Sequence, residues 1–111
     1  MSEQENAANK IAEMHAIDFV KKLPLSILAP VPCIDEDGEI LFEWYEKPKN
    51  ERSSIFSVIF DDNGYIFAKM SDGKEVVRGQ LYYSPRALKI VLYELIDFHN
   101  NINTEINEAK P

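Results

Sequence analysis

The chain has 111 residues, of which 45% are hydrophobic, and its formal net charge is −7 at pH 7. This length fits a single domain, residues 1–111, and the lone cysteine, Cys33, excludes an intramolecular disulfide and a zinc site made of cysteines alone. No apolar run approaches the roughly 20 residues of a transmembrane helix, and the acidic N-terminus lacks the pattern of a secretory signal, so we expect a cytoplasmic protein without membrane contact.

The first predicted element is a helix over residues 7–23, preceded by a polar lead-in, residues 1–6, that we expect to be flexible. Its apolar residues recur at steps of three and four, as on one face of a helix. Lys21 and Lys22 suit the negative end of the helix dipole, and Pro24 ends the helix. The apolar stripe consists of Ala8, Ile11, Ala12, His15, Phe19, Val20 and Leu23.

The next stretch, residues 24–32, is called the proline segment because it contains Pro24, Pro30 and Pro32. Each proline lacks a backbone N–H and has a fixed φ. These properties disfavour an interior strand and favour an extended crossing segment or an edge strand. The apolar residues of the segment are expected to pack across the body of the domain.

Four strands are predicted next, in an antiparallel meander with a turn or loop between each pair. Hydrophobic residues alternate along the strands, and glycine-containing turn signals separate them. Asn63-Gly64 is the strongest of these signals, because both residues readily adopt positive φ. Gly79 is interpreted as a bulge or a point of close approach. The predicted strands are residues 39–46, 54–60, 65–70 and 74–83, with a polar loop at 47–53.

Ser84 and Pro85 predict the start of a second helix, with Ser84 as its N-cap and Pro85 in its first turn. Apolar residues then recur at steps of three and four. We expect this helix to fray through Asn100–Asn103 and the tail, residues 103–111, to be flexible. The predicted fold class is therefore α+β: a four- to five-stranded antiparallel meander flanked by an N-terminal and a C-terminal helix.

The predicted strands carry apolar residues on both sides of the sheet. In the first of them, Ile40, Phe42 and Trp44 alternate with Leu41 and Tyr45. The C-terminal helix can cover one face, and the other face requires the N-terminal helix, the proline segment or a second subunit, because a bare face would expose a large apolar patch. A homodimer is therefore one of the expected arrangements.

The most acidic stretch of the chain, residues 35–46, holds six carboxylates, no basic residue and the only tryptophan. Its sequence D-E-D-G-E resembles part of a calcium-binding loop, in which alternating carboxylates such as Asp35 and Asp37 are ligands. Gly38 stands two places too early for that loop, however, and an apolar strand follows. The stretch is therefore predicted to be a hairpin turn without a metal, and the acidic turn at residues 61–64 receives the same interpretation.

The uneven charge distribution decides which partners are expected. Residues 1–46 carry ten acidic and three basic side chains, whereas residues 47–111 carry nine of each. Such a surface repels nucleic acid phosphates and suits a basic protein partner. Trp44 or Tyr45 could add an aromatic anchor if either is exposed. We therefore predict a partner-binding edge made of Asp35, Glu36, Asp37, Glu39, Glu43, Trp44 and Tyr45.

No residue pattern predicts catalysis, and we assign no catalytic residue, metal ligand or cofactor. Cys33, His15 and His99 are the residue types of a thiol nucleophile and its base, but nothing in their spacing brings them together. Cys33 follows Pro32 in an apolar segment, where a buried, inert thiol is expected, and both histidines lie on apolar helix faces. Glu43 could be a functional carboxylate among aromatic residues, although an outward-facing strand residue explains it as well.

Two runs of the sequence resemble a group of small bacterial proteins of no settled function. These runs are P-V-P-C-I-D-E-D-G-E-I-L-F-E-W-Y and S-I-F-S-V-I-F-D-D-N-G-Y-I-F-A. The resemblance covers about residues 16–82 and consists of a helix ending near L-P, a P-x-P…D-G-E-I-x-x-E-W strand and an N-G-type hairpin. It implies no catalytic residues, and proteins of this kind are often encoded by phage, plasmid or island DNA.

The function predicted from these observations is that of a non-enzymatic protein-interaction module. Its concrete form would be an inhibitor, an immunity protein or an antitoxin from a mobile element, which turns its acidic hairpin edge towards a basic partner. One alternative is a small enzyme, or the accessory subunit of an enzyme, with a carboxylate or a Cys/His site. Another is a structural homodimer whose interface is a face of the sheet.

Overall fold

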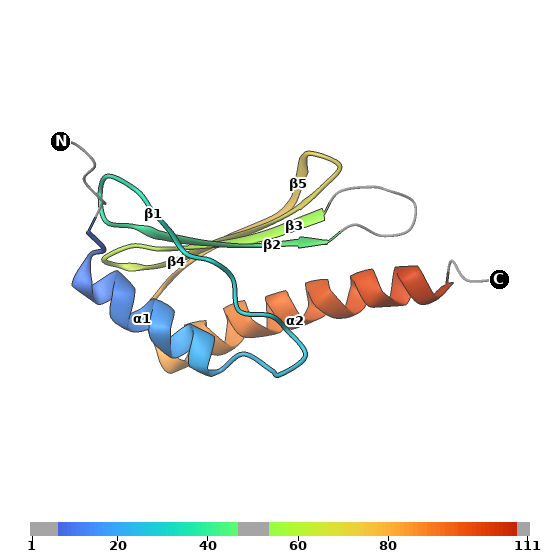
Figure 1. Ribbon diagram of the computed structural model, residues 1–111, viewed down its shortest axis with the longest axis horizontal. Helices are drawn as coiled ribbons and strands as arrows, with labels where there is room; N and C mark the ends of the chain where they lie inside the picture. Colours follow the sequence, from blue (N-terminus) through green and yellow to red (C-terminus); the bar gives the residue numbers. More distant parts are fainter. Residues whose placement is uncertain (1–6, 47–53, 109–111) are drawn as a thin grey trace.

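The protein folds into one five-stranded antiparallel sheet with two helices, as the computed structural model shows (Figure 1). The structure describes residues 7–46 and 54–108. The predicted flexible residues 1–6, the last three residues of the predicted flexible tail at 103–111, and the predicted polar loop at 47–53 lie outside the described residues. The α+β class and the antiparallel sheet flanked by two helices are confirmed.

The strands follow one another across the sheet in chain order, so the sheet is a plain meander. Each strand pairs antiparallel with the next, and the first strand is only two residues long. The elements are α1 (Lys10–Lys21), β1 (Cys33–Ile34), β2 (Ile40–Glu46), β3 (Ser54–Phe60), β4 (Gly64–Ser71), β5 (Lys74–Tyr82) and α2 (Pro85–Glu108).

Helix α1 begins one turn later than its apolar stripe predicted, because Asn9 caps it. The Asn9 side-chain oxygen accepts hydrogen bonds from the backbone N–H groups of Ile11 at 2.9 Å and Ala12 at 3.1 Å. Such a cap satisfies N–H groups that have no partner inside the helix. Ala12 and Phe19 then face the core and are fully buried.

Helix α2 begins as predicted and extends further than predicted. The Ser84 hydroxyl oxygen accepts a hydrogen bond from the Ala87 N–H at 3.0 Å, which confirms the N-cap. The helix continues to Glu108, past the fraying that we expected at Asn100–Asn103. The sequence has no glycine or proline between Pro85 and Pro111, and asparagine lowers helix propensity by only a fraction of a kcal/mol.

Two of the turns form by different means from those the sequence indicated. Neither Asn63 nor Gly64 has positive φ; instead, the Asp61 carboxylate accepts hydrogen bonds from their backbone N–H groups at 2.7 and 2.8 Å. Positive φ occurs in the next hairpin turn, at Asp72 with 54° and Gly73 with 77°. An aspartate that bonds to backbone N–H groups ahead of it can replace left-handed residues in making a turn.

Gly79 is a point of close approach rather than a bulge. It pairs with Phe67 on β4, and a Cβ atom at this position would lie 2.4 Å from a ring carbon of that phenylalanine. The ring of Phe67 therefore lies against the backbone of β5. The bulge between β4 and β5 occurs instead at Lys69 and Met70.

The core lies between the sheet and the two helices, which both pack on the same face (Figure 1). Along β2 and β3 the residues on this face are buried, and the aromatic rings contact one another. The ring centroid of Phe19 in α1 lies 5.6 Å from that of Phe60, with the rings edge to face. This geometry stabilises an aromatic pair by more than the burial of its surface alone. The largest fully buried side chains are Tyr65, Phe19, Phe56, Phe60, Leu95, Val58 and Val91.

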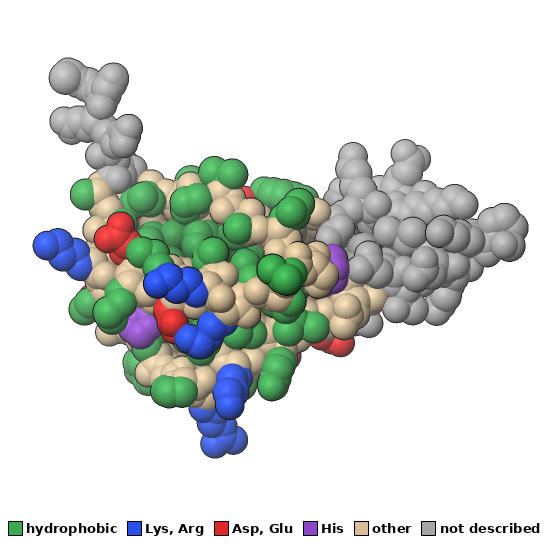
Figure 2. All heavy atoms as spheres, turned by 60° about the horizontal axis from the view of Figure 1, so that its bottom comes forward, with side chains coloured by type: hydrophobic (Ala, Val, Ile, Leu, Met, Phe, Trp, Pro, Cys, Tyr) green, Lys and Arg blue, Asp and Glu red, His purple; other side chains and the backbone are tan. Residues whose placement is uncertain are grey.

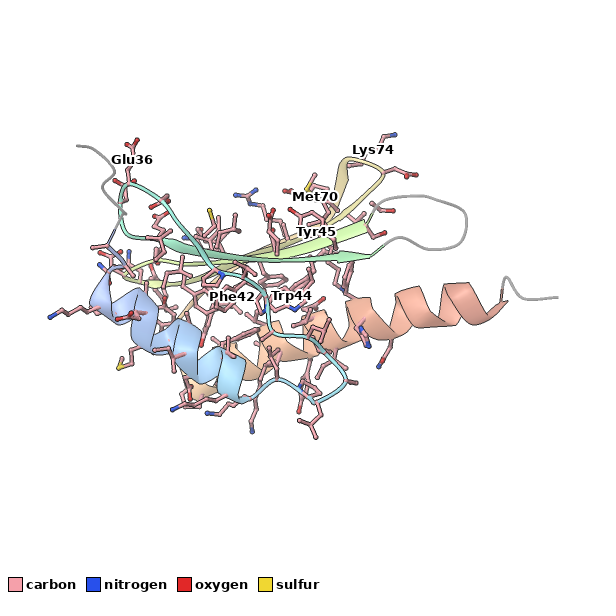
Figure 3. All side chains as sticks on the ribbon, viewed as in Figure 1. Glu36, Phe42, Trp44, Tyr45, Met70 and Lys74 are labelled. Carbon is pink, nitrogen blue, oxygen red and sulfur yellow. The ribbon has the colours of Figure 1, made fainter. Side chains whose placement is uncertain are left out.

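The opposite face of the sheet is called the open face, because neither helix covers it (Figure 1). Figure 3 shows Phe42 and Trp44 on the helix side and Tyr45 and Met70 on the open side. The proline segment also lies on the helix side, where Ile27 is buried in the core. Among the described residues, no element covers the open face.

Candidate functional site

The turn between β1 and β2 holds four carboxylates on a rigid backbone. The Asp35 side-chain oxygen accepts hydrogen bonds from the N–H groups of Asp37 and Glu39, both at 2.9 Å. Gly38 has φ of 83°, and its carbonyl oxygen accepts a hydrogen bond from the Asn9 N–H at 2.9 Å. The turn is thus fixed both by its own side chain and by the start of α1.

The turn between β3 and β4 lies at the same end of the sheet, because alternate connections of a meander share an end. This turn is fixed by Asp61, whose carbonyl oxygen also accepts a hydrogen bond from the Tyr83 hydroxyl at 2.6 Å. Together the two turns bring six carboxylates to one end of the molecule, which we call the acidic end. It consists of Asp35, Glu36, Asp37, Glu39, Asp61 and Asp62.

The carboxyl group of Glu39 has a pKa that is raised by burial and by the other carboxylates of the acidic end. Loss of hydration on burial raises the pKa of its carboxyl group, and a hydrogen bond with the Asp35 side chain raises it further. The negative charges of Asp35, Asp61 and Asp37 act in the same direction. Carboxylates from both turns therefore repel one another across the acidic end.

None of the salt bridges among the described residues involves the acidic end. They join Asp18 of α1 to Lys22 just after that helix, Arg78 to Glu75 on β5, and Lys69 to Glu94 and Asp97 of α2. Nor does any group of three or more His, Cys, Asp and Glu residues in the described part of the chain have the arrangement of a metal site. Within residues 7–46 and 54–108, the carboxylates of the acidic end therefore have no positively charged side chain as a partner.

The predicted partner-binding residues fall into two places. Asp35, Glu36, Asp37 and Glu39 lie in the β1–β2 turn at the acidic end; Figure 3 shows Glu36 pointing outward there. Glu43, Trp44 and Tyr45 lie further along β2, away from that turn.

Of the two aromatic residues considered as anchors, only Tyr45 is exposed. Its side chain is 65% exposed, whereas Trp44 is 9% exposed and donates its indole N–H to the Leu28 carbonyl oxygen at 3.0 Å. The Tyr45 hydroxyl donates to the Glu43 carboxylate at 2.5 Å on the open face. Trp44 therefore holds the proline segment against the sheet.

Asp61 and Asp62 were not among the predicted partner-binding residues. The stretch at 35–46 was the most acidic one, and the second acidic turn was interpreted separately as a hairpin. The predicted meander already indicates that the two acidic turns lie together, since every second turn of a meander lies at the same end of the sheet.

The residues considered for catalysis do not come together. Cys33 is exposed on β1, so the expectation of a buried thiol was wrong; the two-residue strand lies at the sheet edge, where little packs over it. His15 lines a groove between α1 and α2 that contains neither Cys33 nor His99. His99 and Glu43 line a different groove, beside the proline segment.

His15 packs against an aromatic ring rather than a nucleophile. Its ring stacks on that of Tyr83 with centroids 3.5 Å apart and planes 10° from parallel. Burial lowers the pKa of His15, and the nearby Asp18 carboxylate opposes part of that shift. Burial also raises the pKa of Tyr65 to about 12, so this tyrosine keeps its proton at neutral pH.

A second exposed apolar surface lies on the helix side of the molecule. Figure 2 shows apolar side chains gathered there with basic side chains between them. Its large exposed side chains are Ile11, Met14 and Ile17 of α1 and Leu25, Leu28 and Val31 of the proline segment.

Comparisons with known proteins give no relative: no family model, no curated protein and no solved structure matches this chain. The resemblance to small bacterial proteins therefore stays a prediction. No helix within the described residues is long and apolar enough to cross a membrane.

Proposed function

We propose that this chain is a non-enzymatic protein-interaction module that binds a basic protein at its acidic end. The observation that carries the proposal is the convergence of two carboxylate-bearing turns at one end of the sheet, where no salt bridge from residues 7–46 or 54–108 neutralises them. Such a concentration of one charge raises the rate of encounter with an oppositely charged partner.

The two turns differ in what their carboxylates can contribute. Asp35 and Asp61 bond to backbone N–H groups and hold the turns in shape. Glu36, Asp37 and Asp62 are exposed, and their carboxylates accept no hydrogen bond among the described contacts. The first pair therefore organises the site, and the second set is available for lysine or arginine side chains of the partner.

An acidic surface that attracts a basic partner suits a protein that binds another protein and neutralises it. An inhibitor, immunity protein or antitoxin encoded by a mobile element and acting in the cytoplasm is the form of the proposal that we favour. Its partner would carry a cluster of basic residues, as proteins that bind or cut nucleic acids do.

Site-specific photo-crosslinking tests this proposal directly. A photoreactive amino acid replaces Glu36 at the acidic end in one variant and Lys74, at the far end of β4 and β5, in the control variant (Figure 3). Both are expressed in the native host, irradiated and analysed by mass spectrometry. We expect a basic protein that crosslinks from position 36 and not from position 74.

Two outcomes would contradict the proposal. One is the same set of crosslinked proteins from both positions, and the other is a position-36 partner without a basic surface. Circular dichroism of both variants checks that the fold is unchanged.

A further inference from the structure

The side chains on the open face form ordered rows, because residues paired across adjacent antiparallel strands lie side by side. Two rows are largely apolar, and the row between them has a charged residue at each edge. From β2 to β5, the rows are Leu41, Ile59, Ile66 and Gln80; then Glu43, Ser57, Ala68 and Arg78; and then Tyr45, Ile55, Met70 and Glu75.

The middle row places opposite charges at opposite edges of the face. Glu43 lies on β2 and Arg78 on β5, three strand spacings or about 14 Å away. No salt bridge joins them; Arg78 instead contacts Glu75 on its own strand, where both side chains are exposed. Ser57 and Ala68 between them are small, so the row is shallow and flanked by larger apolar side chains.

Of the two face-to-face arrangements that place the middle row of one copy over that of the other, only one matches these charges. A two-fold axis parallel to the strands places β2 of one copy over β5 of the other. Glu43 then faces Arg78 of the second copy, and the symmetry repeats the pair. A two-fold axis perpendicular to the strands, in the plane between the sheets, would place Glu43 over Glu43 and Arg78 over Arg78, which is repulsive.

We propose that the open face is the interface of a homodimer whose two-fold axis runs parallel to the strands. The same symmetry stacks apolar residues on apolar residues, with a rotation of about 30° between the sheets from their twist. The dimer also covers the apolar side chains of the open face, which would contact water in a monomer. The matched residues are Ile59 with Ile66, Ile55 with Met70, and Ser57 with Ala68, each with its counterpart on the second copy.

The dimer interface is separate from the acidic end, so the two proposals fail independently. A two-fold axis along the strands brings both acidic ends to the same end of the dimer. Their mutual repulsion is screened beyond about 8 Å at physiological ionic strength, so dimerisation is measured at that salt concentration. A dimer would present two acidic ends side by side to its partners.

Sedimentation equilibrium of single and double charge variants tests this interface. Glu43→Arg alone and Arg78→Glu alone each turn both Glu–Arg pairs into pairs of like charge. We expect each to weaken dimerisation about 100-fold, or about tenfold for each pair. The double variant, Glu43→Arg with Arg78→Glu, restores opposite charges and should recover the wild-type dissociation constant within about threefold.

Mixing the two single variants provides a second test with its own folding control. A heterodimer of Glu43→Arg with Arg78→Glu has two correct pairs, so an equimolar mixture should dimerise about as strongly as wild type, although each variant alone dimerises about 100-fold more weakly. Recovery in the mixture also shows that both variants are folded.

Either of two results would overturn the proposal. One is a wild-type protein that stays monomeric up to about 1 mM, the concentration at which even a weak dimer is half formed. The other is a wild-type dimer whose dissociation constant is unchanged in both single variants, since the perpendicular axis predicts no change.

Discussion

The backbone N–H of Asn9 donates to the carbonyl oxygen of Gly38 at 2.9 Å, which joins the start of α1 to the turn of the acidic end. Asn9 is at the same time the N-cap of the helix. Gly38 has φ of 83°, and a Cβ atom there would lie 2.8 Å from the Asn9 nitrogen. The helix cap and the acidic turn are therefore held in place by one contact.

Gly38→Ala should destabilise the protein by about 2–4 kcal/mol, because it combines unfavourable positive φ with a clash against a backbone atom. Gly73→Ala is the matched control, since Gly73 also has positive φ, at 77°, but no atom within 4 Å of the added methyl group. The control should cost about 1 kcal/mol. Urea unfolding of both variants measures the difference, and equal losses would contradict the proposed contact.

Gly79→Ala should cost about 1–3 kcal/mol, because the added methyl group would lie 2.4 Å from the ring of Phe67. A smaller side chain at position 67 should reduce that cost. The double variant Gly79→Ala with Phe67→Leu should therefore lose less unfolding free energy than the sum of the losses in the two single variants. A double-mutant cycle of unfolding free energies checks this coupling. Strictly additive losses would show that Phe67 does not pack against β5 as described.

Glu39→Gln should stabilise the fold at pH 7. The folded-state pKa of Glu39 is raised above its ordinary value of 4.5, so the ionised carboxylate opposes folding once the pH exceeds the folded-state pKa. As the pH falls through that pKa the penalty is relieved, and below 4.5 it is gone. Thermal unfolding of wild type and variant from pH 4 to pH 8 should therefore converge at low pH. A variant that is less stable at pH 7 would refute the crowding of the acidic end.

The free energy of unfolding should fall as the pH is lowered below 6.5, because His15 resists protonation in the folded protein. Its folded-state pKa is lowered from 6.5, so below that pH the unfolded chain binds the proton more readily and stability falls. His15→Phe keeps an aromatic ring next to Tyr83 without a titrating group, and its stability should be flatter between pH 7 and pH 5. Denaturant unfolding across this range is the measurement, and parallel profiles for the two proteins would contradict the assignment.

The sequence predicts the order of helices and strands well, since the spacing of apolar residues and the residue types in turns depend only on neighbouring positions. Ser84 and Pro85 begin α2 as expected, and Asp37-Gly38 forms a hairpin turn. The start of α1 was missed although asparagine is a favoured N-cap residue, because the apolar stripe already begins at Ala8, before Asn9. The contact that joins the backbone of this cap to Gly38, 29 residues further along the chain, has no local signal in the sequence.

The candidate site was predicted only in part, for a related reason. The carboxylates of one turn are visible as a run in the sequence, whereas their union with Asp61 and Asp62 requires the strand order. The side of the sheet on which each helix packs is likewise a tertiary property. Alternation separates Phe42 and Trp44 from Tyr45, but it does not say which set the helices bury.

The most direct test of the binding proposal is the affinity for the basic protein captured by crosslinking at position 36. The triple variant Glu36→Lys, Asp37→Lys and Asp62→Lys leaves the turn-forming Asp35 and Asp61 in place. Isothermal titration calorimetry should show at least about 100-fold weaker binding for this variant, because three attractive charges become repulsive. An affinity within about twofold of wild type, from a variant with an unchanged unfolding temperature, would contradict the role of the acidic end.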